Sequence, residues 1–257
     1  DRLTISLSHT DKIMITGPMV NTAADALIEE NSTIHQARDA FRATTGWTTP
    51  ICIEVEKHIP IAAGLGGGSA DAAATLRGMA SLADIPLGDD ALFKIGLGIG
   101  ADVPALLMSW QFQMLRMEGI GERLTPLLLQ TNGGQRNQTQ TEADDHPGIM
   151  LVNPGVATST KEVFSAYGEN EETFSQALPL SDTNIKDFGA LIRMGNDLTK
   201  PACKITPAIR DMLMKLTDLS TRFNGYGAAM SGSGATGFAI FPTPDDAKQA
   251  EDAFKRA

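Results

Sequence analysis

Four glycines are clustered within five positions of the sequence, at Gly64, Gly66, Gly67 and Gly68, and Ser69 follows them. Because glycine has no Cβ atom, main-chain N–H groups in such a cluster can approach a ligand closely. The alanine-rich stretch that comes next predicts a helix, and the positive end of a helix dipole favours negative charge. This order of residues therefore predicts a loop that binds the phosphate groups of a nucleotide.

The loop differs from two well-known phosphate-binding glycine motifs. A dinucleotide fingerprint needs a third glycine at the position of Ser69, and a P-loop needs Gly-Lys followed by Ser or Thr, which this loop lacks. A tight turn between a strand and a helix is the alternative, but such a turn needs only one or two glycines. We therefore expect a phosphate loop of another class.

A second candidate for chemistry is Asp102, in the run Gly100-Ala101-Asp102-Val103-Pro104. A carboxylate held between a glycine turn and a proline can accept a proton from a substrate hydroxyl. The competing interpretation is that Asp102 caps a helix that begins beside it. The turn chemistry alone favours neither interpretation.

A second flexible loop, Ser231-Gly232-Ser233-Gly234, follows the run Gly225-Tyr226-Gly227. We expect it to close over bound phosphates, and an ordinary hairpin turn is the alternative. The four histidines show no metal-ligand spacing, so we assign them no chemistry.

The 257 residues are 42% hydrophobic and carry a formal net charge of -10, which predicts a globular protein of one large or two modest domains. The negative charge disfavours nucleic acid as a partner, because a phosphate backbone needs clustered Lys and Arg. The sequence has no apolar stretch of about 18 residues and no signal-peptide pattern at residues 1–10. Cys52 and Cys203 have no partner at disulfide or metal spacing. We expect a cytoplasmic protein with no membrane partner.

The glycine loop is predicted to lie between a strand and a helix. Apolar and polar residues alternate over Ile51–Val55, which predicts the strand, and Ala70–Ala83 favours the helix. Alternation at Leu3–Leu7 and Ile13–Ile15 predicts two earlier strands, joined as a hairpin by a short polar turn.

A helical pattern over residues 21–45 is broken near residues 30–32, where Asn31 or Ser32 is predicted to cap a second helix. The elements expected after the glycine loop and its helix are a helix over Leu87–Leu97, a turn over Gly98–Pro104, a strand over Gln111–Met117 and a polar turn over Glu118–Glu122.

Residues 130–146 have almost no apolar anchor, which predicts a mobile linker. We place the domain boundary at its end, so that residues 1–147 form an N-terminal ATP-binding domain and residues 148–257 form a C-terminal domain. The elements expected in the second domain are strands at Ile149–Val152, Gly227–Met230 and Phe238–Phe241 and helices at Lys161–Tyr167, Pro207–Leu216 and Pro244–Arg256.

The run Pro60–Ala70, with its triple glycine, resembles the phosphate-binding motif of the GHMP kinase superfamily. Further segments resemble other signatures of that superfamily: Gly100–Pro104 its catalytic-aspartate turn, Glu118–Glu122 the hairpin that follows, and Asn153–Gly155, Ser159–Phe164, Asn196–Leu198 and Met230–Ala235 its C-terminal motifs. The resemblance covers nearly all of the chain. It implies an α+β fold with an N-terminal domain like ribosomal protein S5 domain 2, a ferredoxin-like C-terminal domain and an active site in the cleft between them.

The resemblance implies a small-molecule kinase that transfers the γ-phosphoryl group of ATP to an alcohol, with Mg²⁺ offsetting the developing charge. Asp102 is implied as the catalytic residue. The nucleotide contacts implied are Asn31, Lys57, Pro60, Ala63, Gly64, Leu65, Gly66, Gly67, Gly68, Ser69 and Asp71. The substrate contacts implied are Asp102, Ser159, Thr160, Ser231, Gly232, Ser233 and Gly234. For Ser159 and Thr160, capping of a helix is an equally good interpretation.

The triple glycine is similar to that of the superfamily branch acting on a cytidine diphosphate-linked methylerythritol in the non-mevalonate pathway of isoprenoid (terpenoid) biosynthesis. A GHMP kinase for another alcohol, such as homoserine or mevalonate, and a nucleotide-binding relative without catalysis are the alternatives. A monomer and a homodimer both stay open.

Two features depart from the family pattern. The usual Ser-Ser-Asn after the glycines is Ser69-Ala70-Asp71 here, and we hypothesise that Asp71, with Ser69, contacts Mg²⁺. The alternative is an outward-facing Asp71 that stabilises the helix N-terminus.

The family's Ala-Lys-Ile-Asn strand and Gly-Tyr-His motif do not occur in the sequence. We expect them to precede Asp1, and we likewise expect a final strand to follow Ala257. Loss of the lysine would cost on the order of 2 to 4 kcal/mol of transition-state stabilisation, so residues 1–257 alone are predicted to be nearly inactive.

Overall fold

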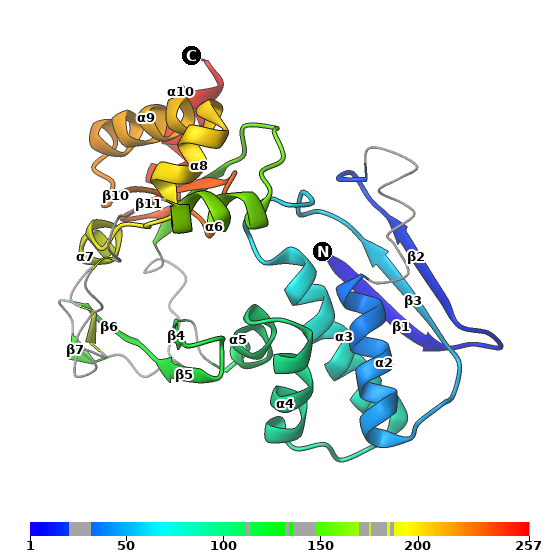
Figure 1. Cartoon of the computed structure of the whole chain (residues 1–257). Coiled ribbons are helices and arrows are strands. Elements are labelled where there is room, and N and C mark those ends of the chain that lie inside the picture. Colours follow the sequence, from blue (N-terminus) through cyan, green and yellow to red (C-terminus); the bar gives the residue numbers. More distant parts are fainter. Residues whose placement is uncertain are drawn as a thin grey trace. The chain divides into compact units, whose positions relative to one another are not determined.

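The structure, a computed structural model, describes residues 1–20, 32–111, 114–131, 134–135, 147–169, 175, 184–185 and 188–256. These residues divide into two compact units, one of residues 1–61 with 66–126 and the other of residues 62–65 with 127–257. Both units mix helices and strands (Figure 1), which confirms the predicted α+β class. Most of the predicted linker at residues 130–146 lies outside the described residues, and a domain boundary at residue 147 stays a prediction.

The first unit contains three strands, four helices and a short hairpin among its described residues. These elements are β1 (Arg2–Leu7), β2 (Lys12–Thr16), α2 (Thr33–Thr45), β3 (Ile51–Glu56), α3 (Gly67–Ala83), α4 (Asp89–Ile99), α5 (Asp102–Met108), β4 (Leu115–Glu118) and β5 (Arg123–Pro126).

The predicted hairpin between the first two strands is wrong, because β3 lies between them. β3 is antiparallel to β1 and parallel to β2, so that Ile53 pairs with Ile5 on one side and with Ile13 on the other. Ile51, Ile53 and Val55 of β3 are almost fully buried. The most apolar of the three strands thus takes the central position, where neighbours cover both of its edges.

The helices of this unit supply the other half of its core. α2 begins at Ser32, whose hydroxyl accepts a hydrogen bond from the N–H of His35 (3.5 Å), as predicted for a capping serine. Phe41 of α2 packs with Leu76 and Met79 of α3 in the same buried cluster as β3. The strand–loop–helix order therefore places the start of α3 at the end of a buried strand.

The turn predicted over Gly98–Pro104 is shorter than expected. α4 continues to Ile99 and α5 begins at Asp102, so that only Gly100 and Ala101 lie outside the two helices. Val103, Pro104 and Leu107 of α5 are buried, and this apolar spacing extends the helix through the predicted turn.

The second unit has a three-stranded antiparallel sheet in the order β10-β11-β8, and α9 and α10 pack against it. Its core includes Met150, Leu216 and Phe241. The described elements are β6 (Leu128–Thr131), β7 (Gly134–Gln135), β8 (Gly148–Val152), α6 (Thr160–Glu169), β9 (Asn184–Ile185), α7 (Phe188–Arg193), α8 (Thr199–Ile205), α9 (Pro207–Arg222), β10 (Gly227–Met230), β11 (Gly237–Phe241) and α10 (Pro244–Lys255). β8, α6, α9, β10, β11 and α10 match predicted elements.

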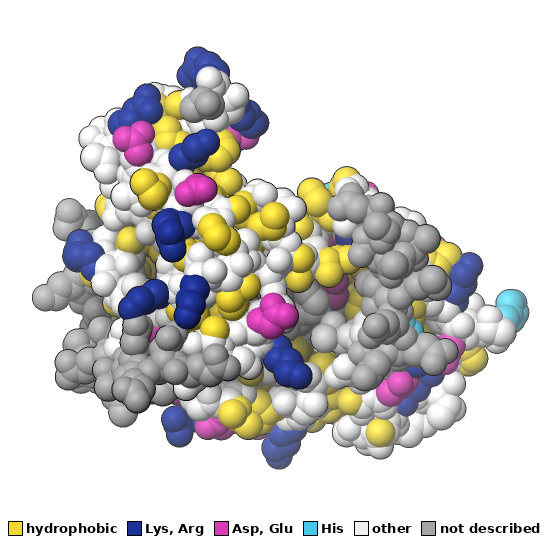
Figure 2. Space-filling view, turned by 45° about the horizontal axis from the view of Figure 1, so that its top comes forward, with side chains coloured by type: hydrophobic (Ala, Val, Ile, Leu, Met, Phe, Trp, Pro, Cys, Tyr) yellow, Lys and Arg dark blue, Asp and Glu magenta, His cyan; other side chains and the backbone are white. Residues whose placement is uncertain are grey.

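On the face shown in Figure 2, Lys and Arg side chains lie among Asp, Glu and hydrophobic side chains. Within the described parts of the chain, no helix is both long and apolar enough to span a membrane.

Candidate active site

The predicted phosphate loop ends in the first turn of α3. The helix begins at Gly67, earlier than the predicted start at Ala70, and its N-cap Gly66 has a left-handed φ of 67°. The carbonyl of Gly66 accepts a hydrogen bond from the N–H of Ala70 (2.8 Å). Because N–H groups in the first turn of a helix have no acceptor within the helix, this turn can donate hydrogen bonds to a phosphate.

The side of the loop formed by Gly68 contacts α2. The hydroxyl of Thr33, the first residue of α2, donates a hydrogen bond to the carbonyl of Gly68 (2.8 Å). No role was predicted for Thr33, and its only sequence signal is its place after the capping Ser32.

The beginning of the loop belongs to the second unit and contacts the second glycine loop there. The carbonyl of Ala63 accepts from the N–H of Thr236 (3.1 Å), and the carbonyl of Gly64 accepts from the hydroxyl of Ser231 (2.7 Å). At Gly64, φ is 73°, and a Cβ atom would lie 2.3 Å from the carbonyl oxygen of Gly234. Only glycine fits at this contact.

Two asparagines hold the second glycine loop. The Asn196 side-chain amide donates to the carbonyls of Met230 (3.0 Å) and Gly232 (2.8 Å). The Asn153 amide donates to the hydroxyl of Thr236 (2.9 Å). Both asparagines lie in segments that resemble family signatures, but no role was predicted for either of them.

Ser159 and Thr160 have different contacts. The Ser159 hydroxyl accepts from the N–H of Glu162 (3.3 Å) at the start of α6, which supports its capping role. The Thr160 hydroxyl lies 2.8 Å from that of Ser233. The structure therefore brings Thr160, but not the cap hydroxyl of Ser159, into hydrogen-bonding contact with the second glycine loop.

Asp102 is the first residue of α5 and its side chain is exposed. The N-cap of α5 is Ala101, and no side chain caps the helix, so the predicted capping role of Asp102 is wrong. Residues four apart share a helix face, and Leu106 on the face of Asp102 lies 3.8 Å from the position of a Cβ atom on Gly66. Asp102 therefore lies on the face of α5 that contacts the phosphate loop.

The turn between β4 and β5 packs against the residue before Asp102. Gly121 has a φ of 94°, and a Cβ atom there would lie 2.1 Å from the Ala101 carbonyl oxygen. The Glu122 carboxylate accepts from the N–H of Ile120 (2.6 Å). Hydrogen bonds from the backbone N–H groups of Glu122 and Ile120 to this carboxylate hold the pKa of Glu122 below its usual value. The predicted polar turn thus supports the Asp102 segment.

Lys57 and Asp71 lie beneath the loop. Both residues are buried, and the Lys57 ammonium is 2.8 Å from the Asp71 carboxylate. Lys57 is therefore not a surface residue, and the outward-facing orientation considered for Asp71 is wrong. The end of the buried strand β3 and the residue one turn into α3 place the two charges face to face.

The remaining predicted contacts stay predictions. Pro60 and Leu65 are half-buried along the loop, and Asn31 lies outside the described residues.

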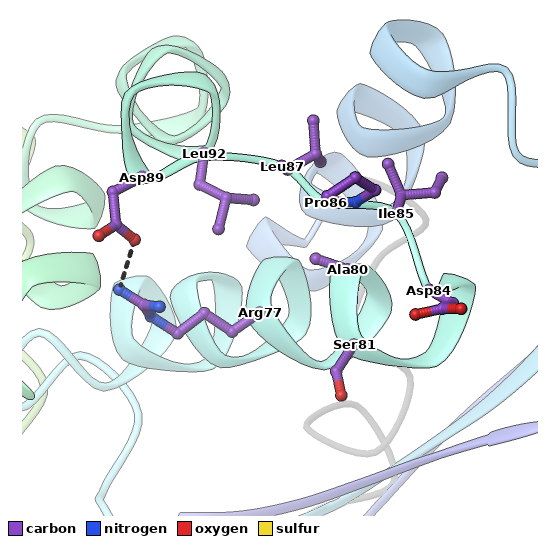
Figure 3. A pocket seen from close by; sticks show the side chains of 9 residues that line it. All are labelled: Arg77, Ala80, Ser81, Asp84, Ile85, Pro86, Leu87, Asp89 and Leu92. Atoms are coloured by element: carbon purple, nitrogen blue, oxygen red, sulfur yellow. Dashed lines mark ion pairs between the residues drawn. The ribbon is translucent and has the colours of Figure 1, made fainter.

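A cavity of about 500 Å³ lies at the other end of α3, and its lining includes no predicted site residue. Figure 3 shows Arg77 of α3 paired with Asp89 of α4 (3.6 Å) at one end of this cavity, with Ala80 and Leu92 between the helices. The cavity is therefore separate from the phosphate loop.

Comparisons with known proteins agree with this geometry. Residues 32–109 match the GHMP kinases N terminal domain and residues 176–257 match the GHMP kinases C terminal domain. A 4-diphosphocytidyl-2-C-methyl-D-erythritol kinase of Mesorhizobium japonicum is 35% identical over 254 residues, covering 97% of this chain and 77% of that protein. The chain belongs to the GHMP kinase family.

A second relative of this GHMP kinase, from Rhizobium johnstonii and bearing the same enzyme name, is 38% identical over 264 residues, covering 100% of this chain and 78% of that protein. A crystal structure of 4-(cytidine 5'-diphospho)-2C-methyl-D-erythritol kinase aligns with a TM-score of 0.69 at 26% identity, covering 99% of this chain and 81% of the other. The structure of homoserine kinase from Cytophaga hutchinsonii aligns with a TM-score of 0.63 at 16% identity, covering 99% of this chain and 80% of that chain. The two proteins therefore share the fold. These likenesses confirm the predicted GHMP kinase fold.

Proposed function

We propose that this GHMP kinase transfers the γ-phosphoryl group of ATP to the 2-hydroxyl of 4-diphosphocytidyl-2-C-methyl-D-erythritol, in the non-mevalonate isoprenoid pathway. The observation that carries the proposal is the glycine loop at the start of α3, which the Asp102 face of α5 contacts. The relatives named for this reaction supply the choice of alcohol.

The first turn of α3 is proposed to hold the ATP phosphates. Main-chain N–H groups of Gly66 to Ser69 and the positive end of a 17-residue helix provide a fixed positive potential. Phosphoryl transfer depends mainly on positioning and electrostatic stabilisation. A rigid loop of N–H donors supplies both to the transferring group.

Asp102 is proposed to accept the proton of the substrate hydroxyl, or to orient that hydroxyl toward the γ-phosphorus atom. Its exposed carboxylate at the start of α5 can reach a hydroxyl in solvent-accessible space. Removal of the proton raises the nucleophilicity of the oxygen as its bond to phosphorus forms.

We propose Mg²⁺ only as an ion bound to the ATP phosphates, whose negative charge it would neutralise. Among the described residues, no group of three or more His, Cys, Asp or Glu side chains could hold a metal ion. Asp71 does not fit a metal-ligand role, because its carboxylate is bound to a buried ammonium. The Ser69 hydroxyl stays our candidate contact, and we assign no step to the metal.

The second glycine loop is proposed to receive the substrate. Thr160 and Ser233 provide paired hydroxyls, while the hydroxyl of Ser231 contacts the first loop. Gly232 is exposed and leaves the backbone of this loop accessible for close contact, whereas Gly234 is buried.

We also propose that the enzyme works in the cytoplasm without nucleic-acid or membrane partners. Cys52 and Cys203 are free thiols, as is usual in a reducing compartment. A monomer and a homodimer are both compatible with this proposal.

The test is Asp102→Asn in the full-length gene product, assayed with ATP and the cytidyl substrate. We expect kcat to fall by about 10²- to 10⁴-fold, with the KM for ATP within a few-fold of wild type. Asp90→Asn is the matched control, because Asp90 is an exposed acidic residue in the first turn of α4, and it should retain wild-type kcat. Near-normal turnover of Asp102→Asn would remove the proposed catalytic role.

A substrate panel separates the alternatives. Phosphorylation of homoserine or mevalonate, but not of the cytidyl substrate, would replace the proposed alcohol. ATP binding without turnover of any of the three would favour the non-catalytic relative.

A further inference from the structure

We propose that Lys57, held between Asp1 and Asp71, is a positioning residue that fixes the phosphate loop from below, so that Asp71 acts on ATP binding through Lys57 rather than by binding a metal. This inference rests on the proposed ATP-dependent function. It differs from that function in the residues involved and in the way they act.

The cluster is buried and its geometry is close. The Lys57 Nζ atom lies 2.5 Å from an Asp1 carboxylate oxygen and 2.8 Å from an Asp71 carboxylate oxygen. The exposed fractions of the three side chains are 6%, 3% and 4%. A lysine is rarely buried unless it is paired, and here two carboxylates pair with it.

The three residues come from three different segments of one compact unit. Asp1 precedes β1, Lys57 follows β3, and Asp71 lies one turn into α3. The Lys57 ammonium therefore joins the end of the central strand to the helix whose first turn forms the phosphate site.

The other Asp1 carboxylate oxygen organises the segment that enters the loop. It accepts hydrogen bonds from the N–H groups of His58 (2.7 Å) and Ile59 (2.8 Å). An ideal Cβ atom on Gly67 would lie 3.1 Å from Ile59 and 3.7 Å from the Asp1 carboxylate. The cluster thus borders the N–H donors proposed to bind phosphate.

The Lys57 backbone is fixed as well. Its N–H donates to the carbonyl of Thr16 (2.7 Å) and its carbonyl accepts from the N–H of Met19 (3.2 Å). A Cβ atom on Gly17 would lie 2.5 Å from the Lys57 backbone. Because the backbone cannot shift freely, the position of the ammonium sets where the first turn of α3 sits.

The arrangement also argues against the Mg²⁺ contact predicted for Asp71. A metal ion at its carboxylate would have to displace the Lys57 ammonium or share one oxygen with it, and both leave like charges close together in a buried site. The lysine already neutralises this carboxylate. A metal role would make Asp71 alone important, whereas a positioning role makes Lys57 equally important.

The experiment measures steady-state kinetics of full-length Asp71→Asn and Lys57→Met at saturating second substrate. We expect the KM for ATP to rise about tenfold or more in both, equivalent to about 1.4 kcal/mol or more, while the KM for the second substrate stays within a few-fold. The Mg²⁺ concentration for half-maximal rate, measured at saturating ATP, should be unchanged in Asp71→Asn.

The matched control is the ion pair of Arg42 and Asp11, which joins α2 to the start of β2 in the same unit (2.5 Å). Asp11→Asn is expected to lower the melting temperature and to leave the KM for ATP unchanged. This control separates a loss of fold stability from a loss of loop geometry.

A coupling test keeps the proposal falsifiable if Lys57→Met folds poorly. Residues in one ion-pair network are non-additive, so the double variant Lys57→Met/Asp71→Asn should raise the KM for ATP less than the product of the two single effects. If Lys57→Met does not fold, Asp71→Asn compared with Asp71→Ala replaces it. The asparagine oxygen can still accept from Lys57, so Asn should be the milder change.

Three results would overturn the inference. They are a wild-type KM for ATP in Asp71→Asn, a raised Mg²⁺ requirement in that variant, and independent effects in the double variant. Failure of the wild-type protein itself to bind or use ATP would instead refute the proposed function.

Discussion

The two glycine loops are supported by different chemistry. Beneath the first loop, Lys57 is buried between two carboxylates, whereas the second loop is held by the neutral amide of Asn196 and by hydroxyl groups. Removing one partner of a buried ion pair costs about 3 to 5 kcal/mol, because a charge is left uncompensated. Removing a neutral donor from a buried carbonyl costs about 1 to 3 kcal/mol. The first loop should therefore tolerate change less than the second.

Among the residues that hold the two glycine loops, the largest effect outside the charged cluster is expected where the loops meet. Gly64→Ala places a Cβ atom 2.3 Å from the Gly234 carbonyl oxygen, so one loop must move. A displacement of about 1 Å at an active site can cost about 100-fold in rate, and we expect kcat/KM for ATP to fall by about that factor. The measurement is steady-state kinetics at varied ATP.

Gly88→Ala is the control for this prediction, because a Cβ atom there meets nothing within 4 Å. Wild-type kcat/KM in Gly64→Ala would show that the contact between the loops does not matter for catalysis.

A smaller effect is expected at Asn196. Asn196→Ala leaves two carbonyls without their donor, and we expect a loss of about 1 to 2 kcal/mol of unfolding free energy, measured by urea denaturation. Asn196→Asp is nearly isosteric but turns a carboxylate oxygen toward the same carbonyls. It should therefore lower the unfolding free energy at least as much as Asn196→Ala. Full stability of the aspartate variant would contradict the assigned donor role.

Ser231→Ala tests a single hydroxyl. It removes the hydrogen bond to the Gly64 carbonyl, and we expect the KM for ATP to rise a few-fold, corresponding to about 1 kcal/mol. Thr217→Ala is the control, because the Thr217 hydroxyl bonds a helix carbonyl on the surface of α9. An equal change in both variants would mean that Ser231 has no special role.

The smallest effect on catalysis is expected at the Arg42 and Asp11 pair, far along α2 from the loop. The Arg42 guanidinium lowers the pKa of Asp11 to about 2 from 3.8. A lowered carboxyl pKa contributes stability that is present above pH 4 and is lost as the pH falls toward 2. Because the Asp11 side chain is 35% exposed, we expect only about 1 kcal/mol.

Unfolding of wild type and Asp11→Asn should therefore differ at pH 6 and converge near pH 2. A difference that persists at pH 2 would contradict the electrostatic origin of this contribution.

Much of the fold could be predicted from local patterns. Alternation at Ile51–Val55 and the alanine-rich run after the glycines gave β3 and α3, because each pattern matches one secondary structure. The strand order could not be predicted, since pairing of β2 with β3 depends on which apolar strand the helices cover. Nearness in sequence favoured the hairpin, and tertiary packing overruled it.

In the candidate site, too, local patterns predicted some features and tertiary contacts determined the others. The glycine loop was predicted from its residue types, whereas the residues around Asp102 left two interpretations open and only the family resemblance implied a catalytic role. The residues that support the two glycine loops, Asn196, Thr33 and Asp1, were missed because an amide, a hydroxyl or a carboxylate acquires its role only from a backbone group distant in the chain. Burial of Lys57 and Asp71 likewise depends on contacts that no local pattern records.

The contacts around Lys57 join residues that are distant in the sequence, which has a consequence for biosynthesis. β1 leaves the ribosome well before β3, with which it pairs, and Asp71 follows later still. Non-local pairings of this kind form slowly, so β1 and β2 lack their partner strand until β3 has been translated, and the Lys57 cluster is complete only after the start of α3. Competence to bind nucleotide therefore arises late during maturation of this unit.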